Sequence, residues 1–502
     1  MRPEVQLREA EAPLVAALDI GSSSVRALLF DRHGRAVANL VPRREHELGT
    51  TPDGGSEADA AELLRLGFEC IDELLERAGE RASEIAAVAP CSFVGNVLGL
   101  DRSGRPVTPL MSYADTRAAA EARALAAELD AGAIHQRTGC PLHPAYLPAR
   151  LRWFEGCRAE LAGEVRRWIS LGEYLELELF GEAAVSTSVA AWSGLLDRSE
   201  LCWDRELLDL LALGEDSLSP VNSEHEPRQG LGKDLAGRWP ALAEAAWFPT
   251  VADGAAANIG SGCDSPQRVA VTIGTSSAVR AVVPYREVER IPEGLWCYRV
   301  DAARSLPGGA LSEGGNLYGW IRQTFRLVDT SGLQKALALS RPDGHGLTVL
   351  PFLAGERSPG WAGEARGAVV GLSLNTTRLE LMRAGIEAVA HRVALVHERL
   401  GELVPEDHEV VASGGALLGS KVWQQIVADA LGRPVAMSSV AEASARGAAL
   451  LALEALGVLD GAAGLPDFIG PSCEPDPGRH AVYREAGLRQ QRLYEKLVGG
   501  TE

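Results

Sequence analysis

Several features that mark other protein classes are missing from this chain of 502 residues. Its eight cysteines stand singly, without the closely spaced pairs of zinc or thioredoxin-type sites, so we expect reduced, buried thiols in a cytoplasmic protein. No stretch reaches the roughly 20 apolar residues of a membrane-spanning helix, and the acidic N-terminus does not resemble a secretory signal. Lysine and arginine number 49 against 68 aspartates and glutamates, and this net charge of −19 argues against nucleic acid or a membrane as partner.

The phosphate-binding GxxxxGK[ST] loop is missing as well, yet a different glycine-hydroxyl turn occurs twice. Residues 15–31 read VAALDIGSSSVRALLFD, and residues 268–283 read RVAVTIGTSSAVRAVV, with one more residue before the arginine. Alternating apolar residues flank each turn, which predicts strand, turn and strand. Such a turn gathers N–H and O–H donors that suit phosphate oxygens. A single copy could be an ordinary hairpin, whereas two copies in corresponding halves favour nucleotide binding.

Strand-like and helical patterns are mixed through both halves, which indicates an α/β protein. The chain is longer than a protein built around a single hydrophobic core normally is, so more than one domain is expected. We place the boundary within 258–266, just before the second turn. This gives an N-terminal domain over 14–258 and a C-terminal domain over 266–495, each with one copy of the turn near its start.

Two aspartates could serve phosphoryl transfer. Asp253 follows an apolar strand and precedes a glycine-alanine turn, where its carboxylate could act as general base toward an alcohol. The alternative is that Asp253 caps the following helix. Asp19, in the first turn, could bind Mg²⁺ directly or through water, with Asp253 as a second candidate ligand, or Asp19 could cap its turn. The small residues of 411–416 leave room for a planar base, although helix-leading glycine turns are common.

Together these motifs resemble those of FGGY carbohydrate kinases, over about 14–497. DIGSSSVR resembles the first phosphate motif, VTIGTSS the second and VVASGGA the adenosine motif of the actin/hexokinase/Hsp70 ATPase superfamily. VADGAAANIGSG resembles the segment of the catalytic aspartate, with Ala252 in place of a usual glycine. The stretch 367–387 follows the family's C-terminal signature, and TGCPLHPAYLPARLRW resembles its N-terminal signature, with Arg150 in place of a usual lysine.

The resemblance implies two RNase H-like domains, each with a five-stranded mixed sheet, around a central cleft. It also implies phosphate transfer from ATP with Mg²⁺, Asp253 as base and Asp19 as metal ligand. The residues implied to bind ATP are Gly21, Ser22, Ser23, Ser24, Arg26, Gly274, Thr275, Ser276, Gly314, Gly414, Gly415 and Ala416. A small-molecule acceptor is then the expected partner, and a homodimer is compatible with the sequence.

Among FGGY kinases the chain most resembles gluconokinases, through PLHP at 141–144, the EYLELELFGE run and DGAAANIGSG followed by VTIGTSSAVR. This resemblance implies conversion of D-gluconate to 6-phosphogluconate, with Asp115, Arg117 and His143 beside Asp253 at the acceptor. A guanidinium can bind a sugar-acid carboxylate bidentately, which would suit Arg117. Alternatively, Asp115 and Arg117 form a surface ion pair and His143 is a bystander.

Other acceptors and another class of function stay open. Val94-Gly95 stands where many pentulose and gluconate kinases carry Met-His, and Tyr113 replaces a usual tryptophan. A kinase for a pentulose such as xylulose or ribulose, or for a polyol, is therefore the main alternative. A non-catalytic ATP-binding sugar sensor is the alternative from another class, and the presence of both Asp19 and Asp253 argues against it.

Overall fold

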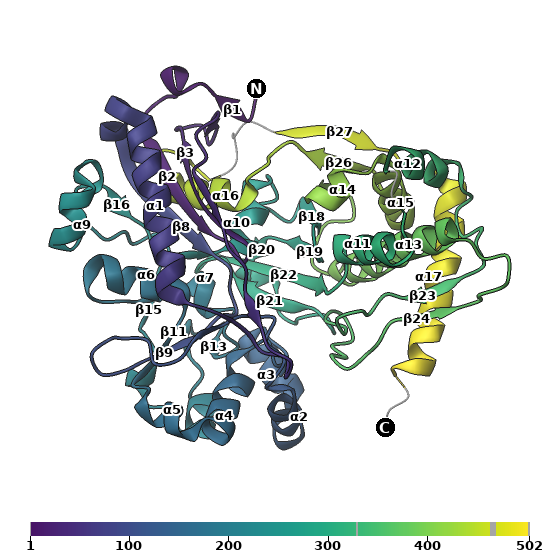
Figure 1. Ribbon diagram of the computed structural model, residues 1–502, viewed down its shortest axis with the longest axis horizontal. Helices are drawn as coiled ribbons and strands as arrows, with labels where there is room; N and C mark the ends of the chain where they lie inside the picture. Colours follow the sequence, from purple (N-terminus) through teal and green to yellow (C-terminus); the bar gives the residue numbers. More distant parts are fainter. Residues whose placement is uncertain (1, 328–329, 462–467, 500–502) are drawn as a thin grey trace.

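Both copies of the repeated turn form β-hairpins at the centre of a sheet. In the computed structural model, which describes residues 2–327, 330–461 and 468–499, strand β2 (Leu14–Ile20) pairs antiparallel with β3 (Ser24–Phe30). In the second copy, β18 (Arg268–Ile273) pairs antiparallel with β19 (Ser277–Ala281). The predicted strand, turn and strand are thus confirmed twice. The two sheets lie side by side, the first on the left of Figure 1 and the second on the right.

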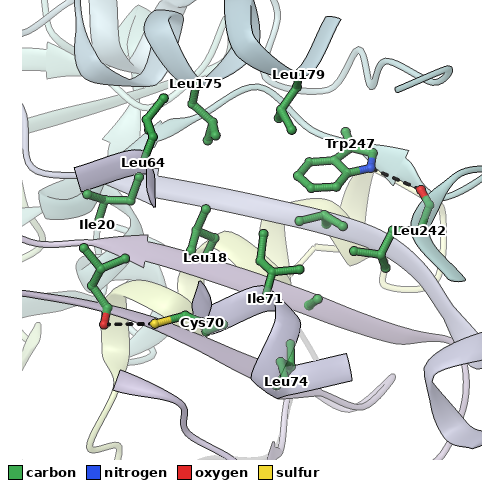
Figure 2. Packing of buried hydrophobic residues seen from close by; sticks show 14 of the residues in the cluster. Leu18, Ile20, Leu64, Cys70, Ile71, Leu74, Leu175, Leu179, Leu242 and Trp247 are labelled. Atoms are coloured by element: carbon green, nitrogen blue, oxygen red, sulfur yellow. Dashed lines mark hydrogen bonds between the residues drawn. The ribbon is translucent and has the colours of Figure 1, made fainter. Parts of the chain in front are cut away.

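The N-terminal sheet has the strand order β1-β4-β3-β2-β8-β16, beginning with the edge strand β1 (Glu4–Val5), and β5 and β17 pair with its inner strands. Strand β8 (Ile85–Ser92) runs parallel to β2, and the short β17 (Val251–Ala252) runs parallel to β8. Alternate β2 residues face helix α1 (Ala60–Ala78), because successive strand side chains point to opposite faces. Figure 2 shows Leu18 and Ile20 in this apolar layer, with α6 (Leu171–Phe180) completing it.

The C-terminal sheet has the order β20-β22-β19-β18-β25-β26-β27, beginning with the short β20 (Val283–Pro284), and β21 (Trp296–Arg299) also pairs with β22 (Arg304–Leu311). Helices α13 (Arg378–Leu400) and α15 (Lys421–Leu431) pack on one face. The described part of each sheet contains eight strands, whereas the resemblance implied five. The difference arises because short segments, many of two to four residues, extend the edges of both sheets.

The remaining strands of these sheets and the main elements packed around them have the following bounds. In the N-terminal half they are β4 (Ala36–Val37), β5 (Arg43–Glu45), β9 (Leu98–Leu100), α2 (Ala119–Glu128), α3 (Ala131–Thr138), α4 (Leu147–Cys157), α5 (Ala159–Glu164), β11 (Arg167–Ile169), α7 (Thr187–Ala190), α8 (Arg205–Leu210), α9 (Lys233–Arg238) and β16 (Ala246–Trp247). In the C-terminal half they are α11 (Gly315–Thr324), β23 (Thr348–Leu350), β24 (Ala368–Val370), β25 (Glu409–Ser413), α14 (Gly415–Leu418), β26 (Val435–Ser438), β27 (Ile469–Cys473) and α17 (Pro477–Leu497).

The two halves meet where helix α10 (Asp253–Gly260) crosses α16 (Ala443–Ala455). A Cβ atom on Gly260 would lie 1.8 Å from the carbonyl oxygen of Ala443, and one on Gly447 would lie 1.8 Å from that of Ala256. The helix backbones therefore touch, which only glycine allows. Helix α16 also packs against β2 and β8, beside which Figure 1 shows it, so part of the second half covers the first sheet.

The eight cysteines, all within the described ranges, form no disulfide, but not all of them are buried. Cys157 is exposed at the end of α4, and Cys202 is exposed in a two-strand hairpin at the surface. Their position in short surface elements is not visible from spacing alone. Among the described helices, none combines the length and the apolar character needed to cross a membrane.

Candidate active site

In the first hairpin, Asp19 lies directly opposite Arg26. One carboxylate oxygen of Asp19 accepts a hydrogen bond from Arg26 Nε at 2.9 Å and forms an ion pair with Nη2 at 2.8 Å. The Nη1 of the same guanidinium lies 2.8 Å from Glu442, which immediately precedes α16. Arg26 is thus paired with two carboxylates, which come from different halves of the chain. The turn itself, Gly21 to Ser23, is partly or fully exposed and leaves its two hydroxyls available at the surface.

Asp253 is the first residue of α10, directly after β17. The N-cap position belongs to Ala252, and no side chain caps this helix, so the alternative in which Asp253 is the cap is wrong. Both β17 and β2 run parallel to β8, on either side of Cys91, which brings Asp253 and Asp19 to neighbouring strand ends. Burial and the negative charge of Asp19 raise the pKa of Asp253 to about 7. A carboxylate with that pKa can take up a proton near neutral pH.

Around the second hairpin turn, the predicted ATP residues of the C-terminal half converge. The N–H of Gly315 donates to the carbonyl of Gly274 at 2.7 Å, and the N–H of Asn316 donates to that of Thr275 at 3.0 Å. Gly414 has a φ of 96°, and a Cβ atom there would lie 2.4 Å from the carbonyl oxygen of Ile273. The turn is therefore held between two glycine-rich segments, 312–316 and 413–416, whose backbones approach it closely.

Asp115 and Arg117 are paired, but inside the protein. Their side chains are 0% and 6% exposed, and Arg117 Nη2 lies 2.6 Å from Asp115 and 2.6 Å from Glu57. The guanidinium also lies over the ring of Trp153, 4.6 Å from its centroid. The alternative of a surface ion pair is therefore wrong in its location. Two carboxylates already bind Arg117. A carboxylate of the acceptor would therefore bind the N–H groups of Arg117 that these two leave unused.

His143 lies among aromatic rings, 5.2 Å from Trp361 and 6.4 Å from Tyr146 between ring centroids. Its Nδ1 accepts a hydrogen bond from the N–H of Ala145 at 3.1 Å. Burial lowers the pKa of His143 to about 3, so the ring is neutral and its Nε2 carries the proton. A neutral imidazole in this position can donate one hydrogen bond to a sugar hydroxyl.

Two charged residues near Asp253 are not among the predicted site residues. Glu442 lies far from every motif in sequence, and only the fold brings it to Arg26. Arg280 sits on β19, and its side chain lies beside Gly254, the neighbour of Asp253. The repeat itself contains the signal for Arg280, because Arg280 is the counterpart of Arg26 in the second copy.

Comparison with known proteins places this arrangement in a family. Residues 14–260 match the model of the N-terminal domain of the FGGY family of carbohydrate kinases, and residues 269–456 match that of its C-terminal domain. The chain belongs to the FGGY family. It is a carbohydrate kinase with the two-domain, actin-like ATPase fold, and FGGY kinases use ATP.

The relatives differ in the acceptor that their names give. The gluconokinase of Bacillus subtilis (strain 168) is 27% identical over 475 residues, which cover 92% of this chain and 91% of the relative. A glycerol kinase of Rhizorhabdus wittichii is 28% identical over 502 residues, covering 97% and 96%. A gluconate kinase structure from Lactobacillus acidophilus superimposes with a TM-score of 0.89 at 25% identity, covering 97% of this chain and 98% of the other. A xylulose kinase structure from the same species reaches 0.90 at 25% identity, covering 97% and 99%.

Proposed function

We propose that this kinase transfers the terminal phosphoryl group of ATP to a hydroxyl of a small sugar acid, with D-gluconate as the preferred acceptor and 6-phosphogluconate as product. The observation that carries the proposal is Asp253, a carboxylate with a pKa of about 7 at the ends of parallel strands, beside Asp19 and the first hairpin. A base poised near neutral pH is what an alcohol acceptor requires.

Each half supplies one set of phosphate contacts. In this proposal Gly21 to Ser24 and the turn Gly274 to Ser276 donate N–H and O–H groups to the ATP phosphates, while Gly314 and 414–416 flank the nucleoside. Phosphoryl transfer depends mainly on positioning and charge neutralisation, which two donor-rich turns provide. Because Asp19 and Glu442 already engage three of the five N–H donors of Arg26, a phosphate oxygen would bind the donors that remain.

The carboxylates of Asp19 and Asp253 fit a Mg²⁺ site. Mg²⁺ prefers oxygen ligands, and the charge of Asp19 raises the pKa of Asp253, a repulsion that a divalent cation would relieve. Bound Mg²⁺ would neutralise phosphate charge. The protein's own contribution is to hold the two carboxylates together and to accept the acceptor's proton on Asp253.

The choice of gluconate rests on the relatives named gluconokinase and gluconate kinase. On the acceptor side, we assign hydrogen bonds from His143 Nε2 and Arg117 to the sugar acid, with Asp115 orienting Arg117 through their ion pair. A xylulose acceptor is the second candidate, because the xylulose kinase structure is as similar as that of gluconate kinase. The free thiols fit a reducing, cytoplasmic compartment.

Coupled measurement of ADP release with gluconate, xylulose, ribulose and glycerol tests this proposal. We expect the highest kcat/KM for gluconate and slow ATP hydrolysis when no acceptor is present, because water lacks the contacts that position a sugar hydroxyl. A higher kcat/KM for xylulose would transfer the assignment to a pentulose. ATP turnover that is fast and equal with every acceptor, or absent with all of them, would refute the proposed transfer.

A further inference from the structure

Arg280 occupies a different register in its hairpin from its counterpart Arg26. In the first copy, Asp19 pairs directly with Arg26 across the two strands. In the second copy, three residues rather than four separate the last paired residues of the two strands, and the arginine stands one residue further from the glycine of the turn. As a result, Arg280 pairs with Ala270. The position that corresponds to Asp19 is Thr272, whose hydroxyl forms a hydrogen bond with that of Ser413 at 2.9 Å. The second hairpin therefore has an arginine without the neighbouring carboxylate.

The guanidinium of Arg280 has no anionic partner within the described part of the chain. It forms no ion pair or hydrogen bond there, and its Nε atom is buried without a hydrogen-bond partner. A buried, unpaired donor lowers the stability of the fold, and more so when the group is charged. Such a cost is tolerated where a ligand supplies the missing acceptor, as sites for charged substrates do.

Arg280 points toward the base. The strand neighbours Val279 and Ala281 point into the core against α13, so Arg280 lies on the opposite face, toward the N-terminal half. A Cβ atom on Gly254 would lie 3.8 Å from Cζ of Arg280 and 3.1 Å from the ring of Trp192. The absence of a side chain at Gly254 therefore lets the guanidinium reach the first turn of α10, next to Asp253.

Opposite charges thus face each other here without touching. Asp253 acts electrostatically on Arg280, yet the two side chains form no direct ion pair. A second cation, Arg357, adds positive charge on the same side while its Nη2 donates to the carbonyl of Leu311 at 3.2 Å. The acceptor oxygen must lie within hydrogen-bond reach of Asp253 when it reacts. The phosphoryl group that joins this oxygen then enters the space that Arg280 borders.

We propose that Arg280 is a catalytic residue whose guanidinium binds the oxygens of the phosphoryl group as it passes to the acceptor. This role rests on the proposed kinase reaction. The hydroxyl loses its proton to Asp253, its oxygen bonds to the γ-phosphorus of ATP, and the bond from that phosphorus to the β–γ bridging oxygen breaks, so that ADP leaves with the electron pair. Charge spreads over the three remaining phosphoryl oxygens, and a fixed cation stabilises it.

The same guanidinium could in principle bind the carboxylate of a sugar acid. The location beside Asp253 argues for the phosphoryl group, because the reacting hydroxyl and the carboxylate of gluconate are at opposite ends of a six-carbon chain. The two assignments make different predictions for neutral acceptors, which have no carboxylate.

Binding of ADP with and without aluminium fluoride, measured by calorimetry in the presence of Mg²⁺, tests the role independently of the acceptor. Aluminium fluoride beside ADP mimics the phosphoryl group in transfer. We expect Arg280→Gln to bind ADP as the wild type does but to lose most of the extra affinity that aluminium fluoride confers, with partial recovery in Arg280→Lys. The exposed Arg286→Gln, which removes one charge from the same half, is the control and should match the wild type.

Turnover with gluconate and with a neutral acceptor completes the test. Arg280→Gln should lower kcat on the order of 10²–10³-fold for both, as removal of one transition-state donor does, with little change in either KM. Unchanged aluminium fluoride binding, or a loss restricted to the KM of gluconate, would overturn the phosphoryl role, and the second result would assign Arg280 to the carboxylate. If the wild type fails to bind ADP at all, the proposed function falls, and this role falls with it.

Discussion

At the scale of the residue, Asp253 must be ionised to accept a proton while it lies in a place that disfavours ionisation. Burial and Asp19 raise its pKa to about 7, and Arg280 and Arg26 oppose that rise without cancelling it. The result is a base of nearly optimal strength for pH 7. A surface aspartate with a pKa near 3.8 would be ionised but far weaker as a base.

Asp253→Asn should therefore lower kcat by about 10²–10⁴-fold, the usual contribution of general acid–base catalysis. In the wild type, kcat/KM should rise with pH and level off at or below about pH 7, because only the ionised carboxylate accepts the proton and Mg²⁺ bound beside it would lower its pKa from about 7. The residual activity of the variant should lack this rise. Initial rates between pH 5 and 9, with saturating Mg²⁺ to compensate for a weakened metal contact, measure both effects.

Stability provides the control for this substitution. The folded state keeps the proton of Asp253 up to about pH 7, whereas the unfolded chain releases it near 3.8, the ordinary pKa of an aspartate. The wild type therefore loses stability as the pH rises through this window. The free energy of unfolding of Asp253→Asn should exceed that of the wild type at pH 8 but not at pH 4. If the variant keeps more than about a tenth of the wild-type kcat, the loss is smaller than the contribution usual for general acid–base catalysis. That result would exclude Asp253 as the base.

Which residues can be predicted from sequence depends on where their partners come from. Asp253 and Asp19 are recognisable because each stands at the end of an apolar run, where parallel strands present side chains at one sheet edge. The burial of Arg117 is not predictable, because Glu57 and Trp153 reach it from distant parts of the chain. The pairing of Arg26 with Glu442 is hidden for the same reason.

At the scale of the element, the two hairpins and the long helices follow from local pattern. The helical spacing of apolar residues over 379–400 predicts a helix, and α13 begins one residue earlier, with a capping box between Thr377 and Glu380. The apolar residues of 85–97 predict one strand, but β8 ends at Ser92, and Gly95 takes a left-handed conformation with φ 65°. Non-local packing decides such endings, and single-sequence periodicity does not contain it.

The crossing of α10 and α16 depends on two glycines, which gives a test at this scale. Gly447→Ala should destabilise the protein by at least about 1–3 kcal/mol, the usual cost of overpacking, because its Cβ would meet the carbonyl oxygen of Ala256 at 1.8 Å. Gly319→Ala, inside helix α11 with no atom within 4 Å of the added Cβ, is the matched control and should stabilise by up to about 1 kcal/mol. Urea unfolding measures both, and equal effects would show that the crossing does not require glycine.

At the scale of the whole molecule, the boundary over 258–266 separates two sheets but does not separate two cores. One apolar cluster combines Val15 and Ala17 of β2 with α10, with α16 and with Val282 of the second half. Arg446 of α16 strengthens the link by donating to the carbonyl of Gly34 at 2.9 Å. The halves are joined at a second place as well, where the N–H of Cys297 on β21 donates to the carbonyl of Gly139 at 2.9 Å.

The shared cluster predicts that the N-terminal half does not fold alone. In the whole chain, Leu450, Leu451 and Leu453 of α16 are buried in the shared cluster, on the face of β2 and β8. A fragment of residues 1–262 would lack α16 and would leave this face uncovered. Burying each leucine contributes about 1.5–3 kcal/mol, so their sum is comparable to the net stability of about 5–15 kcal/mol of a typical domain. We expect the fragment to aggregate or to melt without cooperativity by circular dichroism, and co-expression with residues 263–502 to restore a soluble complex. A monomeric 1–262 fragment with a cooperative thermal transition would instead show that each half has a sufficient core, and that α16 merely docks on a sheet already folded.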